Sequence, residues 1–399
     1  MSLDVTITST NHYFSKNQLY NTFRAGIDQL PHSRCCPLVG LGLPYKCTSG
    51  SKKYLKIHNF FPDDTTPSRN LVPAMSALIL PRPGASFAPS APIPGPSESS
   101  FTTVFGHVLP AAQFLKTSTG KAAYYSIPPA STTPINGSSP DRVLFVHGVQ
   151  TPAIGMFPIA RALHNSFPSA HFVLLDLWGH GLSETPIAAY ESSLFHNLID
   201  DLLDHLRWDK VHLLGFSFGG ALTVGYVASR PQRVQTYTLV APAGLIPRSV
   251  FSEDEQSLIR GRDTETAEEL KTCVVNILEG GDLIVPPNWQ QRVANGEVVA
   301  EAVKDWQMKE NPGHAAAVVA VFRDGGVLDN EEMFKKAVGT GLSNVVVLGE
   351  TDGIVSKEQL VKLGFKNGDV HVVNGAGHGV VRERVEEIKG IVEDFWKSL

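Results

Sequence analysis

Cysteine is scarce in this 399-residue chain, where three of the four cysteines lie in the first 50 residues and Cys273 stands alone. They are too few and too unevenly placed for a disulfide framework, and no histidine or cysteine lies beside them at zinc-finger spacing. The first thirty residues also lack the apolar core of a secretion signal. We therefore expect reduced thiols and a cytoplasmic protein. The alternative is import into an organelle, because basic residues outnumber acidic ones over residues 1–60, as in transit peptides.

The chain also lacks an excess of positive charge and any long hydrophobic run. Its net charge is -5, and no uninterrupted apolar stretch has the length of a bilayer. These absences argue against nucleic acid and membrane as partners and leave a small molecule as the expected one. The segment "VGLGLPY" lacks the third glycine of a dinucleotide loop, and neither a phosphate loop nor a zinc-protease helix is present. No cofactor and no metal are implied, and the oligomeric state stays open.

Residues 1–100 differ in composition from the rest of the chain. Six prolines fall between Pro81 and Pro96, serines are frequent around them, and no periodic segment lasts long. This pattern predicts an N-terminal extension over residues 1–100.

From residue 101 onward the sequence alternates between strand-like and helix-like segments. "AAQFLKTSTGKAAYYSI" predicts a hairpin around a Thr-Gly-Lys turn. Six near-continuous apolar runs follow, of the kind found in parallel strands buried on both faces. They are 142–148, 171–179, 211–217, 236–242, 344–350 and 370–377.

Apolar stripes between these runs predict helices that cover the sheet. One stripe starts after Pro158, a second spans 195–206 and a third spans 381–395. About a hundred residues separate the strands near 240 and 345, and Ser252 with Glu255 forms a capping box there. We predict an open, mostly parallel α/β sheet with a helical lid over 246–312, the core being 101–245 and 313–399.

The segment "GFSFGG" (215–220) holds one serine at the point where a buried strand should end and a helix should begin. Gly215 and Gly219 leave room for the tight turn that would expose the hydroxyl of Ser217. A serine hydroxyl is a weak nucleophile, so it needs a base that a third group orients. The motif is weak by itself, and the rest of the chain has to supply these partners.

His378 is the best candidate for the base. It lies in "NGAGHGVV", between the last strand and the last helix, and so at the same carboxyl edge of the sheet as Ser217. For the carboxylate, "GETDGIVS" offers Glu350 and Asp352, and Asp352 is favoured because it lies beyond the strand end. The chain order is then serine, aspartate, histidine, which is the order in α/β-hydrolases.

A developing oxyanion needs two fixed N–H donors. The N–H of Phe218 is one candidate, and "HGVQ" supplies the other through Val149, with Gln150 as the alternative. We expect His147 to brace this loop.

Two further sets of residues are expected near the site. In "DLWGHGLS" we expect Asp176 and His180 to shape a loop rather than to react. The residues predicted to form an apolar wall for the substrate, with lid packing as an equal explanation for the tryptophans, are Phe216, Trp178, Trp289 and Trp306.

Residues 101–399 resemble the α/β-hydrolase superfamily, in the capped branch of carboxylesterases, lactonases, cofactor-free haloperoxidases and carbon-carbon bond hydrolases. The resemblance rests on five motifs in order: His147-Gly148, "DLWGHGLS", "GFSFGG", "GETDG" and "GAGHG". It implies Ser217 as nucleophile, Asp352 as acid and His378 as base.

Two positions narrow the expected reaction. Epoxide hydrolases and haloalkane dehalogenases have aspartate where Ser217 stands, and carbon-carbon hydrolases often have asparagine where Phe216 stands. We therefore expect a serine hydrolase acting on an ester or lactone of a small, largely apolar molecule. The alternatives are carbon-carbon cleavage or acyl transfer with the same three residues, and a non-catalytic ligand-binding receptor.

Overall fold

An eight-stranded sheet runs through the residues that the computed structural model describes, which are 78–86, 88–130, 140–260, 267–280 and 283–399. These residues belong to a unit that spans Met75–Leu399. The order of the strands is β1-β2-β4-β3-β5-β6-β7-β8. Strands β1 and β2 form the predicted hairpin, β2 pairs antiparallel with β4, and all pairs from β4 to β8 are parallel. The strands are β1 Gln113–Lys116, β2 Lys121–Ile127, β3 Arg142–Val146, β4 His171–Leu175, β5 Val211–Phe216, β6 Val234–Val240, β7 Asn344–Gly349 and β8 Val370–Val373.

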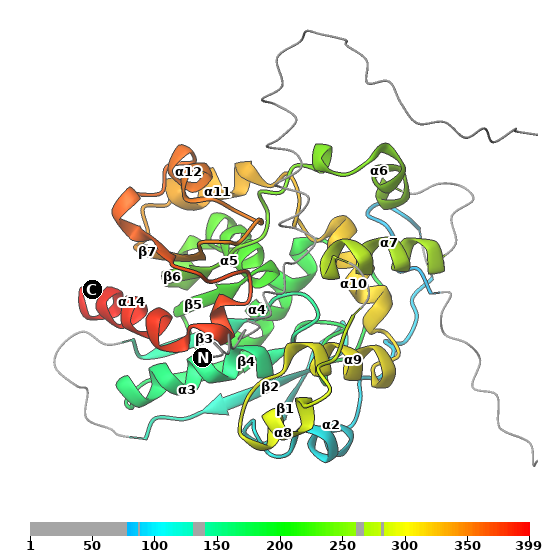
Figure 1. Ribbon diagram of the computed structural model, residues 1–399, viewed down its shortest axis with the longest axis horizontal. Helices are drawn as coiled ribbons and strands as arrows, with labels where there is room; N and C mark the ends of the chain where they lie inside the picture. Colours follow the sequence, from blue (N-terminus) through cyan, green and yellow to red (C-terminus); the bar gives the residue numbers. More distant parts are fainter. Residues whose placement is uncertain (1–77, 87, 131–139, 261–266, 281–282) are drawn as a thin grey trace, which may run out of the picture. The chain divides into compact units, whose positions relative to one another are not determined.

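Helices cover both faces of this sheet (Figure 1). Helices α3 (Phe157–Ser166) and α14 (Val385–Lys397) pack on each other over one face. The other face carries α4 (Ser192–Leu206), α5 (Phe218–Ser229), α11 (Glu331–Gly339) and α12 (Lys357–Lys362). The predicted mostly parallel sheet between helices is therefore confirmed.

Alternation along the strands explains why the sheet is buried on both sides. In β3, Leu144 and Val146 join the hydrophobic cluster under α4 and α5, whereas Val143 and Phe145 join the cluster under α3 and α14. Successive side chains of a strand point to opposite faces, so an unbroken apolar run fills two cores at once. This is the physical basis of the near-continuous apolar runs in the sequence.

The interval between β6 and β7 contains the predicted helices of the lid. They are α6 (Glu253–Arg260), α7 (Ala267–Glu279), α8 (Trp289–Ala294), α9 (Ala300–Glu310) and α10 (His314–Asp324). The capping box is formed, with the Ser252 N–H donating to Glu255 Oε2 (2.8 Å) and the Glu255 N–H donating to Ser252 Oγ (3.3 Å). Helix α10 lies beyond the expected boundary at 312, yet it packs on α7 and α9. The helices between β6 and β7 thus continue to Asp324.

The other expected boundary, at residue 100, falls inside a helix. Helix α2 (Glu98–Phe105) begins at Ser97, whose hydroxyl accepts the N–H of Ser100 (3.1 Å). Upstream of it, Leu80 is buried and Ile93 forms a β-bridge with Thr185. Residues 78–100 thus pack against the α/β core, which the high proline and serine content did not indicate. Residues 1–77 lie outside the described part.

The third apolar stripe, over 381–395, is divided between two helices. Helix α13 (Val380–Glu383) ends at Arg384, whose φ of -130° and ψ of 49° are not helical, and α14 starts at the next residue. Both helices pack on α3, and α14 also packs on β7.

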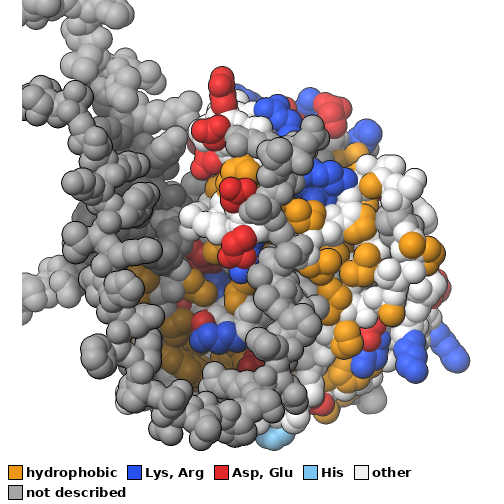
Figure 2. Space-filling view, turned by 90° about the vertical axis from the view of Figure 1, so that its right-hand side faces the viewer, with side chains coloured by type: hydrophobic (Ala, Val, Ile, Leu, Met, Phe, Trp, Pro, Cys, Tyr) orange, Lys and Arg blue, Asp and Glu red, His pale blue; other side chains and the backbone are white. Residues whose placement is uncertain are grey.

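In the described part of the chain, no helix combines the length and the apolar character that crossing a bilayer requires. The face toward the lid helices α7 and α10 carries charged side chains scattered among hydrophobic ones (Figure 2). Ile284, between α7 and α8, is 77% exposed.

Candidate active site

Ser217 lies in a sharp turn between β5 and α5. Its φ of 54° and ψ of -118° place a non-glycine residue in a strained region, which the surroundings must stabilise. The Ser217 N–H donates to the carbonyl of Val240 (3.0 Å), and the Ser217 carbonyl accepts the N–H of Ala243 (2.9 Å). A Cβ at Gly219 would lie 2.0 Å from the carbonyl oxygen of Val146. Only glycine therefore allows α5 to start this close to β3.

His378 connects Ser217 to Asp352. Its Nε2 lies 2.9 Å from Ser217 Oγ, and its Nδ1 lies 3.0 Å from Asp352 Oδ2. The carboxylate of Asp352 is fully buried and also accepts the N–H of Ile354 (3.0 Å). Because the carboxylate accepts, Nδ1 carries the proton and Nε2 is free to accept the hydroxyl proton of Ser217. The structure thus brings the three predicted side chains into one hydrogen-bonded series.

The other candidate acid, Glu350, has a different partner. Its carboxylate accepts the N–H of Gly375 (2.7 Å), at the start of the loop that leads to His378. Glu350 therefore holds that loop, whereas Asp352 contacts the imidazole.

The "HGVQ" loop passes directly beside Ser217. A Cβ at Gly148 would lie 2.9 Å from Ser217 Cβ, and Gln150 has a φ of 66°. Phe218 is the first residue of α5, so its N–H has no acceptor within the helix. The amides of Phe218 and Val149 thus lie on the two segments that flank the serine, as the sequence predicts for an oxyanion hole.

Replacing Gly148 by alanine is expected to lower kcat for ester hydrolysis by about 10²-fold, the size of effect seen when one oxyanion donor is lost. The added methyl group would displace the loop from Ser217, because the gap of 2.9 Å is too short for two carbon atoms. Steady-state kinetics would measure the effect. Gly390→Ala on α14 is the matched control, since a Cβ there meets nothing within 4 Å. A Gly148→Ala enzyme with the kcat of the control would contradict the role of this loop.

His147 braces the same loop from inside. Its Nε2 accepts the N–H of Leu177 (2.9 Å), so Nδ1 carries the proton and donates to the carbonyl of Gly148 (2.7 Å). Burial lowers the pKa of His147 well below its usual value. The neutral imidazole therefore ties the loop after β3 to the loop after β4.

Asp176 organises the "DLWGHGLS" loop. Its carboxylate accepts the N–H groups of Ala153 (2.9 Å) and Leu182 (3.0 Å) and the hydroxyl of Tyr125 (2.9 Å). Burial raises the pKa of Asp176 to about 6. All of these contacts are to protein groups, which fits the loop-shaping role expected for Asp176.

Polar side chains of the lid reach both of these loops. Gln307 of α9 accepts the N–H of Gly181 (2.6 Å) and donates its amide to the carbonyl of Gln150. The Nδ1–H of His314, in α10, donates to the carbonyl of Gly179 (2.8 Å). Neither Gln307 nor His314 was predicted from the sequence to lie near the site. The available signal was a polar residue at the start of the apolar segment "HAAAVVAVF".

Three buried histidines lie next to one another, with His180 between His147 and His314. The ring of His180 lies 5.2 Å from that of His147 and 4.9 Å from that of His314. Burial lowers the pKa of His180 to about 4 and that of His314 to about 3. His180 and His314 are therefore neutral in the folded protein at neutral pH. As the pH falls from about 6.5 toward their folded pKa values, protonation favours the unfolded state and the free energy of unfolding decreases.

The free energy of unfolding should therefore fall between pH 6.5 and 5.5, by about 1 kcal/mol for each of His180 and His314. The raised pKa of Asp176 opposes part of this, because its protonated form is favoured in the folded state. Urea unfolding at several pH values would measure the slope. In His314→Gln, the decrease in the free energy of unfolding between pH 6.5 and 5.5 should be smaller by the contribution of one histidine. An unaltered pH dependence would contradict the lowered pKa of His314.

The four predicted wall residues separate into two groups. The ring of Phe216 lies 5.2 Å from that of His378 and is therefore at the site. Trp306 packs edge-on against Phe101 of α2 (5.4 Å), and Trp289 lies 6.3 Å from Phe105. Trp178 is 1% exposed, within the cluster under α4 and α5. Packing of the lid against α2 thus accounts for Trp289 and Trp306.

A cavity of about 190 Å³ lies between α2, α9 and the short helix η2 (Ala153–Met156) that follows the "HGVQ" loop. Its wall is mostly apolar, with Phe105, Ile154 and Val303 among the lining residues. Arg161 and Glu297 add charges.

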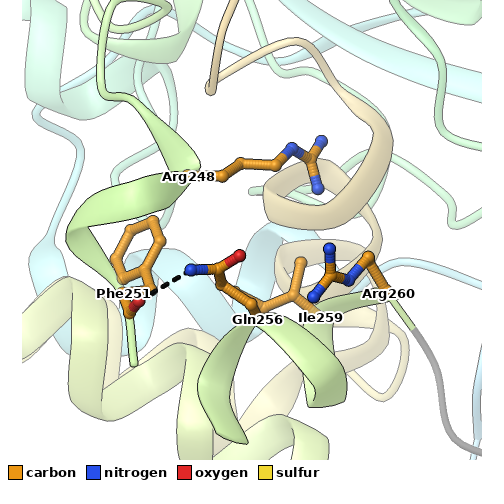
Figure 3. A pocket seen from close by; sticks show the side chains of 5 residues that line it. All are labelled: Arg248, Phe251, Gln256, Ile259 and Arg260. Atoms are coloured by element: carbon orange, nitrogen blue, oxygen red, sulfur yellow. Dashed lines mark hydrogen bonds between the residues drawn. The ribbon is translucent and has the colours of Figure 1, made fainter. Parts of the chain in front are cut away.

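Figure 3 shows a second hollow, where the Gln256 amide donates to the Phe251 carbonyl (2.8 Å). Its volume is about 10 Å³, room for about one water molecule. This volume is too small for an organic substrate, so we do not consider it a substrate site. It is lined by Arg248, Phe251, Gln256, Ile259 and Arg260.

Within the described residues, no group of three or more histidine, cysteine or acidic side chains is placed to hold a metal ion. Cys273 has a free thiol, and burial raises its pKa.

Comparisons with known proteins agree with this architecture. A family model described as "alpha/beta hydrolase fold" matches residues 141–270. A 2-hydroxy-6-oxononadienedioate/2-hydroxy-6-oxononatrienedioate hydrolase from Pseudomonas putida is 26% identical over 65% of the chain and 89% of its own length. Among solved structures, a putative lipase from Acinetobacter baumannii has a TM-score of 0.53, with 16% identity over 75% of the chain and 94% of its own. An enol-lactonase from Burkholderia xenovorans has a TM-score of 0.51, with 17% identity over 71% and 99%.

Proposed function

The chain belongs to the α/β-hydrolase superfamily, and on that premise we propose that it is a serine hydrolase that cleaves carboxylic esters or lactones through an acyl-enzyme. The observation that carries the proposal is the hydrogen-bonded series from Ser217 through His378 to the buried Asp352.

In the acylation step, the Ser217 oxygen attacks the carbonyl carbon of the ester while His378 Nε2 takes the hydroxyl proton. Asp352 stabilises the imidazolium that forms. The amides of Phe218 and Val149 donate to the oxyanion of the tetrahedral intermediate. When the intermediate collapses, the bond to the alcohol oxygen breaks and His378 returns its proton to that oxygen.

Deacylation repeats these steps with water as the nucleophile. His378 takes a proton from water, the resulting hydroxide attacks the acyl carbon, and Ser217 leaves with that proton. The products are a carboxylic acid and an alcohol, or a hydroxy acid from a lactone. The cavity beside Ile154 is our candidate for the apolar part of the substrate.

A panel of esters and lactones, assayed with the purified full-length protein, tests this proposal. Turnover of at least one ester or lactone, with the acid as product, is the expected result. Absence of turnover across a panel that spans short, long, aromatic and cyclic acyl groups would contradict it.

The relative from Pseudomonas putida favours carbon-carbon bond hydrolysis as a second candidate function, because that protein is named a 2-hydroxy-6-oxononadienedioate/2-hydroxy-6-oxononatrienedioate hydrolase. The same three side chains would then cleave a carbon-carbon bond beside a ketone. Product analysis distinguishes the two reactions, since carbon-carbon cleavage releases no alcohol.

A further inference from the structure

Arg382 lies four residues after His378, in helix α13. The guanidinium carbon lies 5.6 Å from the centre of the Phe216 ring, and that ring lies 5.2 Å from the imidazole of His378. Its Nη1 is 3.8 Å from the position of a Cβ at Gly155, in η2. The guanidinium thus lies near Phe216, the residue before Ser217, and near η2, which follows the "HGVQ" loop.

One nitrogen of the Arg382 guanidinium is buried without a hydrogen bond to any described residue. Nη1 is shielded from solvent and has no hydrogen-bond partner in the described part of the chain. Its contact with the Phe216 ring is a cation–π contact, which satisfies none of the N–H groups. A charged N–H donor that is buried without an acceptor is costly, so such an arginine is expected where an anion binds to it.

Burial and two carboxylates act in opposite directions on the pKa of Arg382. Burial lowers the pKa of its guanidinium, while Glu383 of α13 and Glu301 of the lid helix α9 raise it. Nη1 of Arg382 thus has N–H groups without an acceptor among the described residues, and the geometry of a guanidinium suits a planar carboxylate bound through two N–H groups.

We propose that Arg382 binds an ionised carboxylate of the substrate, so that the preferred substrates are esters or lactones that carry a second, negatively charged carboxyl group. This inference rests on the proposed function. It makes Arg382 a specificity-determining residue, which binds the remote end of the substrate while Ser217 attacks the ester.

Matched substrates test the proposal. Mono-(4-nitrophenyl) glutarate is compared with 4-nitrophenyl pentanoate for a charge on the acyl side, and 4-carboxyphenyl butyrate with 4-carbamoylphenyl butyrate for a charge on the alcohol side. We expect kcat/KM to be at least tenfold higher for the charged member of one pair. In Arg382→Met this ratio should fall to about one. Arg382→Lys, which keeps the charge without the fork, should give an intermediate ratio. Equal ratios in the wild type and Arg382→Met would overturn the proposal.

Two control variants separate anion binding from general effects. Arg384→Gln removes a neighbouring arginine that is 39% exposed and paired with Glu387 (3.7 Å), and it should keep the wild-type ratio. Glu301→Gln removes a charge that competes with the substrate, so it should keep or raise the ratio. If Glu301→Gln and Arg382→Met lower the ratio equally, Arg382 is a contact to the lid and the proposal is overturned.

Binding to Ser217→Ala separates this inference from the proposed hydrolysis. Monomethyl glutarate should bind saturably by calorimetry, more weakly at high salt, and not to the Ser217→Ala/Arg382→Met double variant. Binding without turnover of any ester by the wild type would contradict the hydrolase function and support the anion site. Turnover without preference for a charged ester, and without binding of monomethyl glutarate, would support the hydrolase function and contradict the anion site.

Discussion

Replacing Ser217 by alanine is expected to lower kcat for ester hydrolysis by about 10⁴-fold or more, because the variant has no nucleophile to form the acyl-enzyme. The fold should be retained. Ser217 holds the turn through its backbone bonds to Val240 and Ala243, and alanine keeps both bonds. Initial rates with the best ester of the panel, together with the thermal unfolding midpoint, would measure both effects.

Ser229→Ala is the matched control for this experiment. Ser229 ends the same helix, α5, and its hydroxyl donates to the carbonyl of Gly225 (2.8 Å), remote from the proposed reaction. The control should remain within about twofold of the wild-type rate. A Ser217→Ala enzyme that works as well as this control would exclude the acyl-enzyme.

The second large effect is expected for Asp352→Asn, which should lower kcat by about 10³- to 10⁴-fold. An amide in place of Oδ2 can donate to His378 Nδ1, which stabilises the tautomer whose Nε2 carries the proton. That tautomer cannot accept the proton of Ser217, and an uncharged side chain does not stabilise an imidazolium. Single-turnover and steady-state kinetics would locate the loss in the acylation step.

Glu350→Gln distinguishes the two acids of "GETDG". The Glu350 carboxylate accepts the N–H of Gly375, and a glutamine can preserve that bond through its carbonyl oxygen. We expect a loss of less than tenfold. If Glu350→Gln were the more damaging of the two changes, the assignment of the acid would be wrong.

The sheet could be predicted from the sequence because its strands carry an unambiguous physical signal. Runs such as "RVLFV" (β3) have to be apolar on both faces, since α3 and α14 cover one face and α4 and α5 the other. The sharp turn between β5 and α5 was predictable for a similar reason. The turn at Ser217 requires small residues at fixed positions, and Gly219 has no space for a side chain.

The choice between Asp352 and Glu350 could be made from position alone, since the acid beyond the strand end is the one beside His378. The edges of the lid could not be predicted in the same way. Helix α10 is as apolar as a core element, and no local pattern indicates that it packs on α7 and α9. Residues 78–100 were predicted as part of the N-terminal extension because they are rich in proline. A single buried side chain such as Leu80 gives no periodic pattern that would indicate packing.

Gln307 and Arg382 illustrate the same limit at the site. Each is one polar residue on a helix, and its meaning comes from partners that are distant in sequence. Gln307 bonds the loop residues Gln150 and Gly181, and Arg382 lies against the ring of Phe216. No local pattern encodes these contacts.

The most direct measurement of the central claim is covalent labelling of the native full-length protein with a fluorophosphonate, followed by peptide mass spectrometry. If His378 and Asp352 activate Ser217, one phosphonyl group should appear on Ser217, and none on the Ser217→Ala protein. Labelling should be slowed by orders of magnitude in His378→Ala. An unlabelled wild-type protein, or a label that is equally strong in Ser217→Ala, would contradict the account.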